Sequence, residues 1–521
     1  MAPALRLGTR RSTLAWAQSL WVAERLRALS PGREIELVAI ETRGDRITDV
    51  PLRELEGKEF FSAEIDTALL DGHVDITVHS LKDLSLDRPA DIVLGAIPAR
   101  ENPRDAIVFR SDARDRLLSG KPLRIGTSAP RRIENVPRFL ERAVPGGKPG
   151  CIESVEIRGN VDTRLGRLHE HGDSPRKLDG VVLALAGLIR LGQDQRPDGG
   201  RERLSRLLRD VRWMVLPLTD CPSAPGQGAL AVECRRADLD ARAVLDPLND
   251  ATTARLVGHE RRLLGKLGGG CHQQFGATCV EHPACGTLMY VKGRVRDNET
   301  LDEVIWPGMP AEPGGLITPW DGFRARASTD VPPAEVSAEV RDAFRHSPAP
   351  VFIAHSRALP TGIEGELKDR RIWTSGTASW WRLAARGVWV EGCAEGLGYD
   401  WIASTLAEPV LALPALSGWQ VLSHAGSAQH WPAGQVIGTY RLPEVTTQSI
   451  PDASAVTHVY WASGSQFRHL WSRLPPAVHH ACGPGRTAEV LRSAGVHRMT
   501  VFPSVHEWRR WLKIDPHTAT D

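Results

Sequence analysis

The sequence predicts an α/β protein built on mainly parallel sheets. Short apolar strands alternate with amphipathic helices through the first half of the chain, and each strand runs into a polar turn. This alternation is typical of parallel sheets covered by helices. The 521 residues are enough for about three to four domains.

The strands of the first half follow one another in a regular order. We expect them at residues 5–9, 37–40, 74–78, 124–127, 155–157 and 180–184. A helix should follow the first strand, with Ser12 or Thr13 as its N-cap. In such sheets ligands bind beyond the carboxyl ends of the strands, so these ends are where we look for a site.

Positive side chains recur at these strand ends. They are Arg10, Arg11, Arg43, Lys82, Arg131, Arg132, Arg158 and Arg164. A single arginine there is usually a solvated surface residue, but cations on successive ends predict a cleft for a polycarboxylate or phosphorylated ligand. The planar guanidinium suits carboxylates because it can bind them in a bidentate manner.

Asp83 is a lone carboxylate among these cations. One interpretation is a local ion pair with Lys82 or a helix cap. The other is an anion that stabilises positive charge developing on a substrate, or that relays protons. The residues alone leave both open.

Cys271 follows three consecutive glycines, Gly268 to Gly270. Free cysteine is usually a small buried hydrophobe, whereas a thiol on a glycine loop is well placed to attack or hold a ligand. A metal site with the nearby Cys279, Cys285, His272 or His282 is a rival interpretation. The spacing offers no CxxC or HxxxH pair, so we predict no metal site.

Composition excludes several classes of protein. The net charge of +2 gives no global field for nucleic acid. No apolar run approaches the roughly 20 residues that span a bilayer, and the N-terminus does not resemble a signal peptide. We therefore expect a cytoplasmic monomer with no membrane or nucleic-acid partner, and no disulfide framework among the eight scattered cysteines.

Many short motifs of the first half together resemble one family, porphobilinogen deaminase, also called hydroxymethylbilane synthase. The resemblance covers about residues 4–300. Its motifs lie at 8–10, 42–45, 79–83, 101–106, 126–128, 131–132, 158–160, 185–188, 225–228 and 269–271.

The resemblance implies a fold and a domain plan. It implies two periplasmic-binding-protein-like α/β domains, the first discontinuous, and a small α+β third domain that carries the cofactor cysteine. The expected bounds are 1–103 with 209–236, then 104–208, then 237–346, with a further C-terminal region at 347–521.

The same resemblance implies the chemistry. Cys271 would carry a covalent dipyrromethane primer, on which four porphobilinogen units are joined head to tail with loss of ammonia, before water releases hydroxymethylbilane. Asp83 would be the catalytic residue. The remaining family positions divide into cofactor-binding residues, namely Lys82, Thr127, Ser128, Arg131 and Arg132, and substrate-binding residues, namely Arg10, Ser12, Gln18, Arg158 and Arg164. Such an enzyme is a transferase of porphyrin and heme biosynthesis.

Two stretches depart from the family pattern. The family's flexible lid motif corresponds to residues 57–64 of this chain, where Glu59 replaces a glycine and Ala63 replaces a lysine. Pro130 stands where a leucine is usual, and it could shift the turn before Arg131.

The C-terminal region repeats a strand, Ser/Gly turn and helix unit, around 372–390, 459–465 and 482–496. This repeat resembles uroporphyrinogen-III synthase, a two-lobed α/β lyase that cyclises hydroxymethylbilane with inversion of one ring, so the resemblance implies a bifunctional enzyme. Candidate carboxylate-binding hydroxyls are Thr377, Ser463, Ser465 and Thr487, with helix capping as the alternative for each.

Two further hypotheses stay open. The C-terminal region could be an inactive structural domain. The whole chain could also be a non-catalytic anion-binding protein on the same scaffold, although that reading explains neither the glycine-mounted Cys271 nor Asp83.

Overall fold

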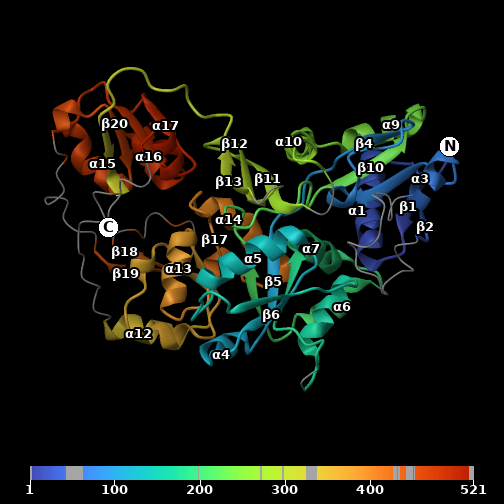
Figure 1. The fold of residues 1–521 in the computed structure, drawn as a ribbon, viewed down its shortest axis with the longest axis horizontal. Helices are drawn as coiled ribbons and strands as arrows, with labels where there is room; N and C mark the ends of the chain where they lie inside the picture. The colour runs from blue at the N-terminus through green and yellow to red at the C-terminus, as the bar shows by residue number, and fades with distance from the viewer. Residues whose placement is uncertain are drawn as a thin grey trace.

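The structure is a computed structural model, and it describes residues 3–42, 63–172, 174–197, 199–269, 273–295, 299–323, 337–425, 427, 431, 435–441, 450 and 452–514. The described strands form five sheets; in Figure 1 the first contains the blue strands β1 and β2 together with the green β10, and the fifth lies in the mainly red C-terminal lobe. The mixed α/β fold that the sequence predicts is confirmed.

The first sheet has five strands in the order β2-β1-β3-β10-β4. Their bounds are β2 (Ile35–Ile40), β1 (Leu5–Arg10), β3 (Ile76–Ser80), β10 (Leu230–Arg235) and β4 (Ile92–Ala96). Helices α1 (Thr13–Leu29), α3 (Ala63–Leu70) and α9 (Leu239–Leu245) accompany it. Its core includes Leu7, Val22 and Ile76, all fully buried.

The second sheet repeats this arrangement in the order β7-β6-β8-β5-β9. Its strands are β7 (Ile152–Val155), β6 (Leu123–Gly126), β8 (Gly180–Ala184), β5 (Asp105–Arg110) and β9 (Val211–Val215). The accompanying helices are α4 (Ala113–Leu118), α5 (Pro130–Ala143), α6 (Val161–Gly166), α7 (Leu185–Gln193) and α8 (Gly200–Leu207).

Both sheets are mainly parallel, as the sequence predicts, but each contains one reversed strand. In each, four strands run in the same direction and one is antiparallel to both of its neighbours: β10 in the first sheet and β5 in the second. The reversal has a simple cause, because β5 and β10 are the strands by which the chain enters one sheet from the other. We call the two connecting stretches, residues 97–104 and 216–229, the crossover segments.

The third sheet is a three-stranded antiparallel meander covered by one helix. Its strands are β11 (Gln274–His282), β12 (Gly286–Arg294) and β13 (Thr300–Ile305), and the helix is α10 (Ala251–Lys266). Leu256 of α10 packs with Phe275 and Met289 of the sheet.

The C-terminal half contains two parallel sheets. The fourth has the order β17 (Gly392–Cys393), β16 (Ile372–Thr374), β15 (Val351–Ile353), β18 (Gln420–His424), β19 (Gln435–Tyr440). The fifth has the order β14 (Pro319–Asp321), β20 (His458–Trp461), β21 (His479–Cys482), β22 (Met499–Val501). Helices α12 (Ala338–Arg345), α13 (Thr377–Ala385) and α14 (Tyr399–Leu406) belong with the fourth sheet, and α15 (Gly464–Leu470), α16 (Arg486–Ser493) and α17 (Val505–Trp511) with the fifth.

The chain crosses between these two sheets twice. Strand β14 pairs with β20 in parallel register, although it lies before residue 347, where we expect the C-terminal region to begin. Helix α12 also precedes that position, and its Phe344 packs in the core that contains the fourth sheet. The domain bounds given above stay predictions.

The fourth sheet shares its hydrophobic core with the second. Trp380 packs edge-on against Phe139 with ring centroids 5.2 Å apart, and Trp389 packs against Phe109 at 5.0 Å. The backbone N–H of Val215, in edge strand β9, donates to the carbonyl of Glu391 at 2.6 Å. The C-terminal region is therefore packed onto the second sheet rather than tethered to it. None of the described helices has the length and apolar character that a bilayer span requires.

Candidate active site

The turn that carries Lys82 and Asp83 is fixed from two sides. It is a 3₁₀ turn, Leu81–Asp83, that follows β3 directly. On one side, Gln18 of α1 and Ser80 donate hydrogen bonds to each other, at 3.0 and 3.2 Å. On the other side, Arg261 of α10 donates to three backbone carbonyls of this turn and the loop after it, those of Leu81, Leu84 and Ser85, at 2.8–3.2 Å. The side chain of Asp83 remains exposed.

Arg131 and Arg132 lie in the first turn of α5, and both are buried around one carboxylate. Asp105, the first residue of β5, accepts hydrogen bonds from Arg131 Nη1 at 2.6 Å and from Arg132 Nη2 at 2.7 Å. Gln227 Nε2 donates to the same carboxylate at 2.8 Å. Burial raises the pKa of Asp105, but the two guanidinium charges outweigh it and hold the pKa well below its usual range. Pro130 begins α5, a position that proline favours, so the departure from the family pattern is accommodated.

Charges from the two sheets act on one another across this site. Burial lowers the pKa of Lys82, the charges of Asp83 and Asp105 oppose that shift, and Arg131 and Arg132 reinforce it. Burial also lowers the pKa of Arg164, with Arg132 and Arg158 acting in the same direction and Asp83 opposing. Lys82 Nζ of the first sheet and Arg131 Nη2 of the second both donate to Gln227 Oε1, at 3.4 and 3.1 Å, so the two strand ends meet at this side chain.

Arg158 and Arg164 differ from the pair on α5 in their partners. Arg164 Nε donates to the carbonyl of Gly159 at 2.7 Å. Buried Nε and Nη2 of Arg158 have no hydrogen-bond partner among the described residues. Buried donors of this kind are rare unless a ligand or water completes them, so Arg158 is ready to bind an acceptor.

The remaining predicted residues occupy the ends of β1 and β6. Arg10 is the last residue of β1, and Ser12 caps α1 by accepting a hydrogen bond from the N–H of Ala15 at 3.3 Å. The capping alternative therefore holds for Ser12. Thr127 is buried directly after β6 and accepts from the N–H of Ala129 at 3.4 Å, and Ser128 beside it is half-buried.

Three predicted features lie outside the described residues: Cys271, Arg43 and the lid up to residue 62. The described residue nearest before Cys271, Gly269, has a φ of +62°, and a Cβ there would lie 3.6 Å from Leu86. Gln273, on the other side of Cys271, donates from Nε2 to the carbonyl of Gly269 at 3.0 Å. The loop that carries Cys271 therefore starts beside the stretch that follows Asp83.

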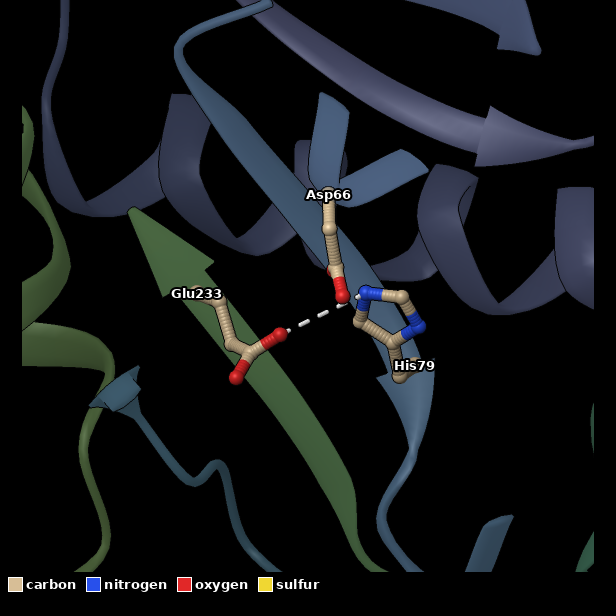
Figure 2. A group of neighbouring side chains, drawn as sticks. All are labelled: Asp66, His79 and Glu233. Carbon is tan, nitrogen blue, oxygen red and sulfur yellow. Dashed lines mark ion pairs between the residues drawn. The ribbon is translucent and has the colours of Figure 1, made fainter. Parts of the chain in front are cut away.

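One cluster near this site resembles a metal centre in composition. Figure 2 shows that His79 of β3, Asp66 of α3 and Glu233 of β10 point toward one another. Arg88 already binds both carboxylates with four hydrogen bonds of 2.6–2.9 Å, and burial, together with Arg88 and Arg10, lowers the pKa of His79 to about 3. The guanidinium supplies the positive charge here, and the cluster gives no reason to infer a metal ion.

The rival metal site near Cys271 is not supported by the described residues. Cys279 and Cys285 face different hydrophobic clusters, and burial raises the pKa of each thiol to about 12. His282 Nε2 contacts the carbonyl of Leu397 at 3.0 Å.

Sequence reasoning missed three residues of this site. Asp105 and Gln227 stand inside the family motifs quoted above, but no role was assigned to either because their partners come from other segments. Arg261 stands in no motif, and an arginine on a helix is most often solvated, so no sequence pattern distinguishes it.

The four hydroxyl candidates of the C-terminal region lie at helix starts. Ser463 caps α15 by accepting from the N–H of Gln466 at 3.2 Å, and Ser465 is the second residue of that helix. Thr377 begins α13, and Thr487 is the second residue of α16.

The turn before α16 meets a turn of the fourth sheet. A Cβ on Gly398 would lie 3.6 Å from the Cα of Gly485, so the two parallel sheets approach each other at these glycines.

Two similar α/β sheets thus meet at a group of arginines, an arrangement that is suited to an anionic ligand. The family model described as "Porphobilinogen deaminase, dipyromethane cofactor binding domain" matches residues 5–243. The porphobilinogen deaminase of Syntrophotalea carbinolica is 42% identical over 303 residues, covering 58% of this chain and 86% of that protein. The Bacillus subtilis porphobilinogen deaminase is 37% identical over 317 residues, covering 61% of this chain and 86% of that protein. The chain belongs to the porphobilinogen deaminase family, a family of transferases in porphyrin and heme biosynthesis that uses a dipyrromethane cofactor.

Proposed function

We propose that the protein is a hydroxymethylbilane synthase. It joins four porphobilinogen units head to tail, with loss of one ammonia per unit, on a dipyrromethane primer held by Cys271, and then releases the linear product by hydrolysis. The observation that supports the proposal is geometric: the turn that carries the exposed Asp83 meets the buried arginines of the second sheet, since Lys82 Nζ and Arg131 Nη2 both donate to Gln227 Oε1, at 3.4 and 3.1 Å.

The residues present fit an anionic, carboxylate-rich cofactor. Arg158 offers two buried donors without a partner among the described residues, and Arg164 lies close enough for the two charges to interact. Guanidinium groups bind carboxylates in a bidentate manner, so these arginines are suited to acetate and propionate side chains. When bound, the dipyrromethane would supply a nucleophilic pyrrole to which the first unit is joined, and each later unit would be joined to the end of the growing chain.

Asp83 suits the charge that this chemistry creates. Loss of ammonia and attack by a pyrrole place positive charge on ring nitrogens, and a fixed carboxylate stabilises such charge most when it is oriented in advance. Gln18, Ser80 and Arg261 hold the turn from both sides. Because the turn is held in place and the Asp83 carboxylate is exposed, this carboxylate can accept hydrogen bonds from pyrrole N–H groups.

The experiment that tests the proposal is the intact mass of the purified full chain. We expect an addition equal to two linked pyrrole units, a colour with Ehrlich's reagent after acidification, and turnover of porphobilinogen. Cys271→Ser should lose all three, whereas Cys279→Ser, which changes another cysteine of the same region, should keep them. An unmodified wild-type mass would favour the non-catalytic anion-binding alternative.

A second activity, that of uroporphyrinogen-III synthase, is our proposal for the C-terminal region. The observation that favours it is the meeting of two parallel sheets at Gly398 and Gly485, with Thr487 two residues beyond. Incubating the full chain with porphobilinogen and separating the cyclised isomers provides the test. The type-III isomer is expected, and type-I product alone would favour the inactive structural alternative.

A further inference from the structure

The loop after β17 reaches out of the C-terminal region to both crossover segments. The side chain of Glu395, in this loop, is completely buried. Its Oε1 accepts from Arg104 Nε at 2.9 Å, in the first crossover segment, and from the backbone N–H of Leu218 at 3.0 Å, in the second. One carboxylate oxygen thus joins the two stretches that connect the first and second sheets.

A second contact from the same region supports this arrangement. Thr405 Oγ1 of α14 accepts from Asn102 Nδ2 at 2.7 Å, two residues before Arg104. The loop of Glu395 also contacts the third sheet, because the carbonyl of Leu397 lies 3.0 Å from His282 Nε2. The C-terminal region therefore contacts three segments whose relative positions define the deaminase site.

The backbone of Glu395 is itself unusual. Its φ is +56°, in the left-handed region that is uncommon for residues other than glycine. Its neighbour Gly396 has a φ of +75°. A residue held in such a conformation commonly marks a functional constraint, and here the conformation coincides with the contact between the carboxylate and both crossover segments.

A short path leads from Glu395 to the arginines of the site. Arg104 is bonded to Asp105 through the chain, and the carbonyl of Asp105 accepts from the N–H of Leu216 at 2.9 Å, which links the two crossover ends directly. The carboxylate of Asp105 in turn holds Arg131 and Arg132. Movement of Arg104 would therefore move the group that positions both arginines.

We propose that Glu395 is a positioning residue for the deaminase reaction. Its side chain belongs to the C-terminal region and binds both crossover segments. It thereby sets the orientation of the first sheet, with Asp83, relative to the second sheet, with its arginines. The inference rests on the proposed deaminase function and holds whether or not the C-terminal region has an activity of its own.

The test compares two isosteric substitutions in the full-length chain, Glu395→Gln and Glu391→Gln. Glu391 is the matched control, because its buried carboxylate pairs with Arg371 inside the C-terminal region. For Glu395→Gln we expect kcat for porphobilinogen consumption to fall roughly tenfold with KM changed less than about twofold, since misplacement of reacting groups lowers the rate of the chemical step. Glu391→Gln should keep the wild-type kcat and KM.

Hydrogen exchange measured by mass spectrometry is the second readout. The amides of Arg104, Leu216 and Leu218 should exchange faster in Glu395→Gln, whereas the amides of β1 and β3 should not change. If the two variants share the same kcat and the same exchange at the crossover segments, or if Glu395→Gln raises KM alone, the proposal is overturned.

A milder variant covers the case in which Glu395→Gln does not fold. Thr405→Val keeps the shape of the side chain and removes the acceptor of Asn102, so it should lower kcat by about two- to threefold, with faster exchange at residues 102–105. If neither kcat nor the exchange at residues 102–105 changes, the proposed positioning role is contradicted. A wild-type chain without turnover or cofactor mass would instead contradict the deaminase assignment, while the exchange data would still report on the contacts of Glu395.

Discussion

Two aspartates in the same charged site have opposite surroundings. Asp83 ends the turn after β3 and is exposed, whereas Asp105 begins β5 and is fully buried between Arg131 and Arg132. The backbone of the Asp83 turn is held by neighbours, but the Asp105 carboxylate itself is the group that holds its neighbours. The two carboxylates therefore differ in exposure and in occupied acceptor positions, and on this difference we propose a catalytic role for Asp83 and a structural role for Asp105.

The arginines divide in the same way. Arg131 and Arg132 share one buried counter-ion, the carboxylate of Asp105. Arg158 has buried donors without a partner among the described residues. We expect substitutions to separate these two groups by their effects on stability and on substrate binding.

The largest effect is expected for Asp105→Asn. It leaves two buried guanidinium groups without a counter-charge, and breaking a buried pair in this manner costs about 3–5 kcal/mol of the free energy of unfolding. Denaturant unfolding of the purified variant measures this. A loss below about 1 kcal/mol would mean that Asp105 is not the structural partner of these arginines.

The free energy of unfolding of the wild type, measured at acidic pH, tests the same structural role of Asp105. Because the folded pKa of Asp105 is held below its usual range, its contribution is present above the unfolded pKa of about 4 and is lost as pH falls below that value. Asp105→Asn should show a shallower decline in this range than the wild type.

Asp83→Asn should have the next largest effect, and on a different quantity. We expect kcat to fall about 10²–10³-fold, the usual cost of removing a preorganised electrostatic group, with the melting temperature unchanged because the side chain is exposed. Asp87→Asn, which alters an exposed carboxylate of the same loop, is the matched control and should retain wild-type turnover. If Asp83→Asn also lowered the melting temperature, Asp83 would have a structural role like that of Asp105.

Arg158→Gln should give a smaller effect, confined to binding. A hydrogen bond to a charged group contributes about 1.5–3 kcal/mol, so kcat/KM for porphobilinogen should fall about 10–100-fold. The melting temperature should not fall, because Arg158 has no ion pair with any residue that the structure describes. Arg138→Gln, an exposed arginine of α5, serves as the control. Equal kinetics for both variants would remove Arg158 from the site.

The smallest effect concerns Glu408, whose surroundings are the reverse of those of Asp105. Burial, with the charge of Glu101 adding to it, raises the pKa of Glu408 to about 7. The folded state then binds more protons than the unfolded state between about pH 4.5 and 7, so this group lowers stability as pH rises through that window. Glu408→Gln should melt a few degrees higher than the wild type at about pH 8, with the gap closing toward pH 5.

The sequence predicted the α/β class of the fold, and it predicted which residues to look for at the strand ends, but it did not predict the direction of every strand. The cations at 131, 132, 158 and 164 and the pair at 82–83 could be found because each follows an apolar strand that marks its own position. The antiparallel direction of β5 and β10 could not, because it depends on where the chain leaves one sheet for the other. The partners of Asp105 and Glu395 were missed for a related reason, since each contact joins segments far apart in the sequence and neither leaves a local pattern.

The contact between β9 and Glu391 has a consequence for any shortened form of the chain. The backbone N–H of Val215 in edge strand β9 donates to the carbonyl of Glu391, and the indoles of Trp380 and Trp389 pack into the adjoining core. A chain cut before the fourth sheet would expose this strand edge and the apolar surface that the two indoles cover. Exposed strand edges and apolar patches favour aggregation, so we expect such a shortened chain to aggregate more readily than the full chain.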